Sequence, residues 1–121
     1  LYVAAEGARP VLPDGLIALG CTVDIVRAYR TVSDRDGAGA LRGALADGAV
    51  DAVTFASASA VHGFVDAVGT ELARRAPAVS IGPVTSAAVR DAGLTLGAEA
   101  SEATIAALVE ATTRLARHPV E

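Results

Sequence analysis

Strand-like and helix-like patterns alternate five times along the chain, and this alternation restricts the fold more than any other feature. Short apolar runs that are each followed by helical spacing are typical of proteins in which helices join parallel strands. The strand-like runs span 1–5, 22–31, 50–56, 78–81 and 94–98, and the helix-like segments span 9–19, 40–46, 60–68, 86–92 and 102–117. We therefore expect an α/β fold, a three-layer doubly wound parallel five-stranded sheet with the flavodoxin-like order 2-1-3-4-5.

The size and composition fit a single folded domain. The chain has 121 residues, of which 52% are hydrophobic and 20% charged, and this balance excludes intrinsic disorder. We therefore interpret 1–121 as one α/β domain. Because Leu1 already falls within a strand-like run, we also expect the chain to be a fragment of a longer protein.

Charge and cysteine content narrow the possible partners. The net charge is −4 and the charges are interleaved, so we expect no nucleic-acid partner. No apolar run approaches the roughly 18 residues of a membrane-spanning helix, so we expect no membrane partner. Cys21 is the only cysteine and no Cys/His spacing suits a metal, so we expect no metal. A cytoplasmic location is the default expectation.

Common α/β ligand motifs do not occur after the strand-like runs. The loop at 5–10 lacks the Gly-x-Gly-x-x-Gly pattern of dinucleotide-binding proteins, and a P-loop is excluded because the chain contains no lysine. The third run ends without the acid of a receiver domain, and no Gly-x-Ser-x-Gly elbow occurs. Ligands of parallel sheets bind at the carboxyl ends of the strands, which places 5–7, 29–31, 57–59 and 82–85 along one edge.

A more specific pattern emerges from four segments taken together. They are 1–9, the Ala-Tyr-Arg-Thr-Val of 28–32, 51–61 and the Ile-Gly-Pro-Val-Thr of 81–85. Their order and spacing resemble the C-terminal half of the uroporphyrinogen-III synthase family across essentially the whole chain. The family's N-terminal half is absent.

The resemblance implies an enzyme that cyclises hydroxymethylbilane to uroporphyrinogen III, with inversion of the last pyrrole, loss of water and no cofactor. It also implies two similar α/β lobes between which the chain crosses twice, so that 1–32 and 36–121 would belong to different lobes. We expect the missing N-terminal half to be a partner and the fragment alone to be nearly inactive. The vacant place in the sheet would be filled by the fragment's own first strand and helix, or by exchange of that segment in a homodimer.

The resemblance also implies the site residues. Tyr29 is the candidate catalytic residue, because a phenol can donate a hydrogen bond or proton to the departing hydroxyl; the alternative is a Tyr packed at a strand end. The substrate carries acetate and propionate groups, which suit the free N–H groups at helix starts. The expected substrate-binding residues are Ser57, Ala58, Ser59, Pro83, Val84 and Thr85. The alternative for these loops is ordinary helix capping by Ser59 and Thr85, and the alternative for the whole chain is a non-catalytic binding or regulatory module that retains the synthase fold.

Overall fold

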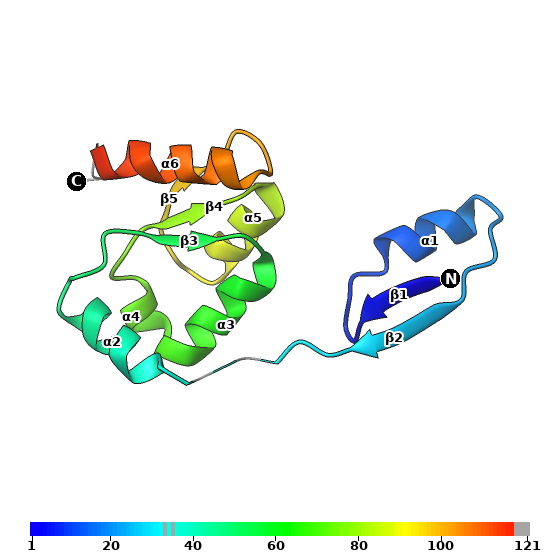
Figure 1. Cartoon of the computed structure of the whole chain (residues 1–121), viewed down its shortest axis with the longest axis horizontal. Coiled ribbons are helices and arrows are strands. Elements are labelled where there is room, and N and C mark those ends of the chain that lie inside the picture. The colour runs from blue at the N-terminus through cyan, green and yellow to red at the C-terminus, as the bar shows by residue number, and fades with distance from the viewer. Residues whose placement is uncertain (33, 35, 118–121) are drawn as a thin grey trace. The chain divides into compact units, whose positions relative to one another are not determined.

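The computed structural model describes residues 1–32, 34 and 36–117 (Figure 1). Ser33 and Arg35 lie outside the described residues, as do 118–121. The first two belong to the segment 33–39, which is polar and contains glycine and which the sequence therefore predicts to be a linker. The chain divides into two compact units, Leu1–Val32 and Ser33–Glu121, which are called unit 1 and unit 2 below.

Unit 1 is a single βαβ motif. It consists of β1 (Tyr2–Ala5), α1 (Val11–Ala18) and β2 (Ile25–Tyr29), and the two strands pair in parallel from Tyr2↔Ile25 to Ala5↔Tyr29. Pro13 does not divide the helix, because it lies in the first turn, where a backbone N–H has no partner within the helix. The helix ends before Gly20, whose φ of 84° places it in the left-handed region that favours glycine.

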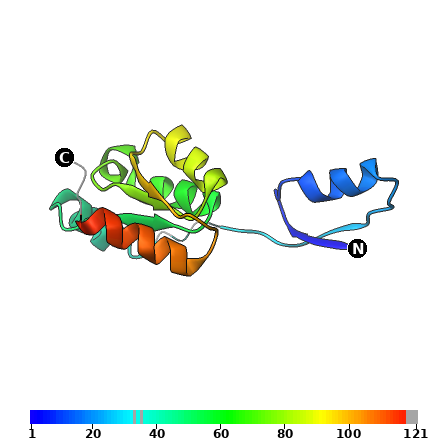
Figure 2. The same cartoon turned by 90° about the horizontal axis from the view of Figure 1, so that it is seen from above.

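Unit 2 is a three-stranded parallel sheet with helices on both faces. The sheet order is β3-β4-β5, and all neighbours are parallel. Helices α3 and α5 pack together on one face, and α6 lies on the other face (Figure 2). The elements are α2 (Ala38–Ala46), β3 (Val53–Phe55), α3 (Ala58–Val68), α4 (Thr70–Ala73), β4 (Ala78–Ser80), α5 (Pro83–Asp91), β5 (Leu96–Glu99) and α6 (Ile105–Arg117).

The core of unit 2 is built from small aliphatic side chains on the two sides of the sheet. Ala78 belongs to the cluster under α3 and α5, while the next residue, Val79, belongs to the cluster under α6. This alternation follows from the strand geometry, since successive side chains point to opposite faces. Phe55 and Phe64 add one edge-to-face pair, with ring centroids 5.4 Å apart.

The prediction of an α/β fold with parallel strands is confirmed, but one continuous five-stranded sheet is not what the structure contains. The strands form a two-stranded sheet, β1-β2, and a separate three-stranded sheet, β3-β4-β5. The pairing of β1 with β3 that the order 2-1-3-4-5 requires is absent among the described residues. The physical reason is that hydrophobic periodicity identifies strands and their buried faces, whereas the choice of a neighbouring strand depends on contacts between distant residues.

None of the helices in the described parts of the chain is long and apolar enough to cross a membrane.

Candidate functional site

The candidate catalytic residue, Tyr29, is the last residue of β2 and so lies at the carboxyl end of that strand in unit 1. It pairs with Ala5 at the end of β1, and its carbonyl oxygen accepts a hydrogen bond of 2.7 Å from the Glu6 N–H. The residue is 62% exposed. The structure thus brings the ends of both strands of unit 1 together and leaves the Tyr29 phenol open to a ligand, whereas its chemical role stays a prediction.

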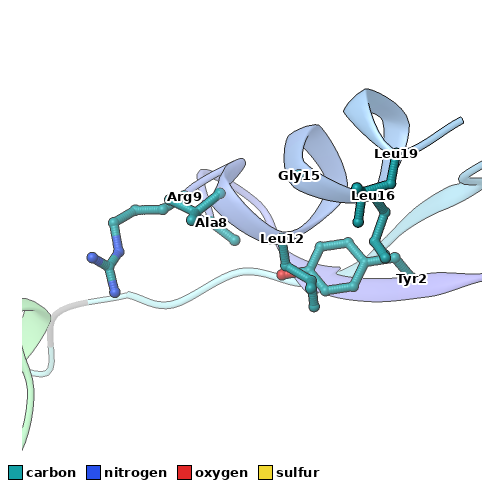
Figure 3. A pocket seen from close by; sticks show the side chains of 8 residues that line it. Tyr2, Ala8, Arg9, Leu12, Gly15, Leu16 and Leu19 are labelled. Carbon is teal, nitrogen blue, oxygen red and sulfur yellow. The ribbon is translucent and has the colours of Figure 1, made fainter. Parts of the chain in front are cut away.

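Unit 1 also contains an apolar groove, which does not include Tyr29. The groove has a volume of about 720 Å³ and is formed by Tyr2 together with residues of α1 and the turn before it. The Tyr2 ring lies beneath α1 beside Leu12 and Leu16, and the Arg9 side chain extends away from it (Figure 3). The groove therefore lies between β1 and α1, on the face of the strand that the helix covers, and it is separate from the carboxyl ends of the strands.

In unit 2, the end of β3 leads directly into α3 through a serine cap. Ser57 has extended backbone angles, and its Oγ accepts a hydrogen bond of 3.2 Å from the Ala60 N–H. The prediction of Ser59 as the cap of a helix at 60–68 is therefore wrong, because the helix begins two residues earlier. Ser59 lies in the first turn, exposed, with its Oγ 3.1 Å from that of Ser57.

The first turn of α3 retains free backbone donors. Within the described residues, the N–H groups of Ala58 and Ser59 have no hydrogen-bond partner, since Ser57 caps only Ala60. Such donors, at the positive end of the helix dipole, suit an anion. The predicted loop 57–59 thus offers the expected chemistry through its main chain.

The end of β4 forms a second helix start beside the first. The Ile81 N–H donates to the Phe55 carbonyl oxygen over 3.0 Å, which ties this loop to the end of β3. Gly82 is the N-cap of α5 and provides no side-chain cap, and Pro83 occupies the first helical position, which suits its missing N–H. The N–H groups of Val84 and Thr85 have no partner within the described residues.

Thr85 lies within a helix in the structure and not in the loop where we expected it. We expected a loop at 82–85 followed by a helix at 86–92, but α5 begins at Pro83 and the Thr85 side chain is only 4% exposed. The apolar pattern misses this start because Pro83, Val84 and Thr85 supply no helical spacing, whereas proline at the first position is a start signal in its own right. Thr85 is therefore buried, and its N–H is the one backbone group of this residue that has no partner among the described residues.

A cluster that the sequence patterns did not reveal lies directly behind this helix start. Ser80, at the end of β4, and Ser86, in α5, are both fully buried. Their hydroxyl oxygens lie 2.5 Å apart, and the Ser86 hydroxyl donates to the Glu99 carboxylate at the end of β5. The only sequence signal was two serines at positions whose neighbours indicate burial, and such serines are ordinarily satisfied locally.

A second hollow in unit 2 lies between β3 and α6, away from the helix starts. Its volume is about 620 Å³, and it is lined by Thr54 and Ala56 and by one face of α6. Ile105 and Val109 of that face are 66% and 60% exposed. The hollow adjoins the edge of β3 that has no paired strand among the described residues.

The donors at the carboxyl edge of unit 2 are thus backbone N–H groups and hydroxyls rather than paired acids and bases. In the described part of the chain, no group of three or more His, Cys, Asp or Glu side chains could hold a metal ion. Parallel strands with helix starts at their carboxyl ends define unit 2 as an α/β unit whose free backbone N–H groups have the chemistry to receive an anion.

Comparison with known proteins identifies the family. The family model "Uroporphyrinogen-III synthase HemD" matches residues 1–110. The chain belongs to the uroporphyrinogen-III synthase family, and the resemblance read from the sequence is confirmed.

Individual relatives agree with this assignment. A protein of Methanothermobacter thermautotrophicus, provisionally named a uroporphyrinogen-III synthase, is 36% identical over 96 aligned residues, which cover 73% of this chain and 38% of that protein. The wild-type crystal structure of the Thermus thermophilus synthase matches with 26% identity and a TM-score of 0.67, over 100% of this chain and 49% of the other. The Helicobacter pylori 26695 synthetase supports the fold alone, with 18% identity and a TM-score of 0.73 over 94% of this chain and 52% of the other. The chain therefore spans about half the length of the solved relatives and 38% of the Methanothermobacter protein.

Proposed function

We propose that the chain is the C-terminal part of a cytoplasmic uroporphyrinogen-III synthase, which cyclises hydroxymethylbilane with inversion of the last pyrrole and loss of water. The observation that carries the proposal is the family match over residues 1–110. The main-chain donors at the starts of α3 and α5 support it, because the substrate carries acetate and propionate groups.

In the proposed reaction, unit 2 binds and orients the substrate. The free N–H groups of Ala58 and Ser59, and those of Val84 and Thr85, would each receive a carboxylate at a helix N-terminus. Such contacts hold the flexible chain of pyrroles in the shape in which the inverted ring closes. Correct positioning of reacting groups is by itself a large contribution to rate.

Tyr29 is the proposed catalytic residue. Departure of the terminal hydroxyl leaves a cationic azafulvene, and a phenol beside that hydroxyl can donate a hydrogen bond or proton to it. Support comes from the exposed position of Tyr29 at a strand end.

We further propose that the two units belong to different lobes of the intact enzyme. β1 and β3 each have an unpaired edge among the described residues, and an apolar hollow adjoins β3. An unpaired strand edge presents free N–H and C=O groups, and together with apolar surface it can bind a further strand. The missing N-terminal half would supply such strands and complete the order 2-1-3-4-5 in a lobe. Completion by the chain's own first strand, within one domain or exchanged in a homodimer, is the alternative arrangement.

The test is a product analysis with freshly prepared hydroxymethylbilane. The protein that carries these residues together with the family's N-terminal half should convert it mainly to the type III isomer, while residues 1–121 alone should give the type I isomer of uncatalysed closure. Type I product from the complete protein would refute the enzyme and leave a binding or regulatory module. Size-exclusion chromatography of residues 1–121 distinguishes a monomer from the exchanged homodimer.

A further inference from the structure

Glu99 ends a chain of hydroxyl groups that runs from the interior of unit 2 to its surface. Ser80 and Ser86 are fully buried, whereas Glu99 is exposed at the end of β5. The Ser86 hydroxyl donates to the Glu99 carboxylate, the two serine oxygens lie 2.5 Å apart, and Ser80 Oγ lies 3.3 Å from the Gly82 carbonyl oxygen. None of these three side chains has a part in the chemistry proposed above.

The number of hydroxyl hydrogens determines which group donates in each of these three hydrogen-bond contacts. There are three contacts but only two hydroxyl hydrogens, because each serine has one hydrogen to donate and a carboxylate only accepts. With Ser86 donating to Glu99, Ser80 donates to Ser86. The Gly82 carbonyl oxygen is then left with the longest of the three contacts. The acceptor on Glu99 therefore fixes the orientation of both buried hydroxyls.

Removal of this acceptor would reverse the hydroxyls. Ser86 would turn its hydrogen to Ser80, and Ser80 would turn its own to the Gly82 carbonyl oxygen. That oxygen already accepts the Ser86 N–H over 2.9 Å in the first turn of α5. A carbonyl oxygen can accept two hydrogens, so the Ser86 N–H would keep its partner but share it with the Ser80 hydroxyl, and sharing of this kind weakens the bond and bends the first turn.

We propose that Glu99 is a positioning residue for the start of α5. By orienting Ser86 and Ser80, it holds the Gly82 turn, and so it keeps the N–H groups of Val84 and Thr85 aimed at a substrate carboxylate. Glu99 itself does not touch the substrate. The part of this inference that concerns substrate binding rests on the proposed function, while the part that concerns the turn does not.

The test compares three variants in the protein that carries these residues with the N-terminal half. Glu99→Ala removes the acceptor, and Glu99→Gln retains one in its amide oxygen. Glu102→Ala removes an exposed acid from the loop that follows β5 and serves as the matched control. Two readouts are needed: KM and kcat for hydroxymethylbilane, and the hydrogen-exchange rate of the Ser86 amide measured by NMR.

We expect Glu99→Ala to raise KM about fivefold, the scale of one ordinary hydrogen bond, with kcat within about twofold of the parent. The Ser86 amide should exchange faster in this variant, while Glu99→Gln and Glu102→Ala behave as the parent in both readouts. Unchanged KM and exchange in Glu99→Ala, or equal impairment in Glu99→Gln, would overturn the inference.

The two proposals fail in distinguishable ways. A parent protein without synthase activity refutes the proposed function, and the exchange rate of the Ser86 amide then decides the role of Glu99 by itself. Faster exchange in Glu99→Ala but not in Glu99→Gln supports the positioning role, and equal rates in all four proteins contradict it.

Discussion

Gly97 is the position where added volume has the clearest predicted consequence. It lies in β5 beneath α6, and a Cβ atom there would meet Leu115 Cδ2 at 2.8 Å and Pro77 Cβ at 3.1 Å. Leu115 belongs to the buried cluster under α6, so it cannot simply move into solvent. Overpacking of this kind typically costs about 1–3 kcal/mol, and we expect Gly97→Ala to lower the free energy of unfolding by that amount.

Urea denaturation of residues 1–121, followed by far-UV circular dichroism, measures this effect. Most of the helical residues belong to unit 2, so the signal reports mainly on the unit that contains Gly97. Gly43→Ala is the matched control, because an added Cβ in α2 meets nothing within 4 Å. It should stabilise the protein by up to about 1 kcal/mol.

A double-mutant cycle identifies the cause of the loss. Leu115→Val removes the two Cδ atoms that the new Cβ would approach, so Gly97→Ala should cost less in that background by about 0.5 kcal/mol or more. If Gly97→Ala is neutral, or costs the same in both backgrounds, the assigned packing of β5 against α6 is wrong.

Further predictions concern the caps and the phenol. Ser57→Ala should lower the free energy of unfolding by about 1 kcal/mol in urea denaturation, while Ser59→Ala should change it by a few tenths, because only Ser57 caps α3. Thr104→Ala should cost a similar amount, about 1 kcal/mol, because Thr104 Oγ1 accepts from the Ala107 N–H at the start of α6, whereas Ser101→Ala should be nearly neutral. Tyr29→Phe should lower kcat several-fold in the active protein with an unchanged melting temperature, since Tyr29 is exposed; unchanged turnover would remove it from the mechanism.

Local patterns in the sequence predicted the elements of this fold but not their association. Each of the five strand-like runs overlaps a strand, although β5 extends one residue beyond its run, because apolar period and turn residues are local signals. Whether β1 lies beside β3 depends on contacts between distant residues, and on strands that the N-terminal half would supply. The pattern therefore led to one continuous sheet, and it could not reveal that the strands form two separate sheets.

Helix starts were the other source of error. A cap at Ser59 was expected, but Ser57 performs this role, and at the start of α6 the cap is Thr104 rather than the earlier Ser101. Two nearby hydroxyl residues compete for each cap, and the choice between them depends on where the chain leaves the preceding strand. The same limit applies to Glu99, whose link to Ser86 joins two elements and has no local signature.

The isomer ratio formed from hydroxymethylbilane tests the central claim most directly. A protein that joins this chain to the family's N-terminal half should yield uroporphyrinogen III in large excess over the type I isomer. The same ratio with and without the protein would show that these residues do not shape the closure of the pyrrole chain.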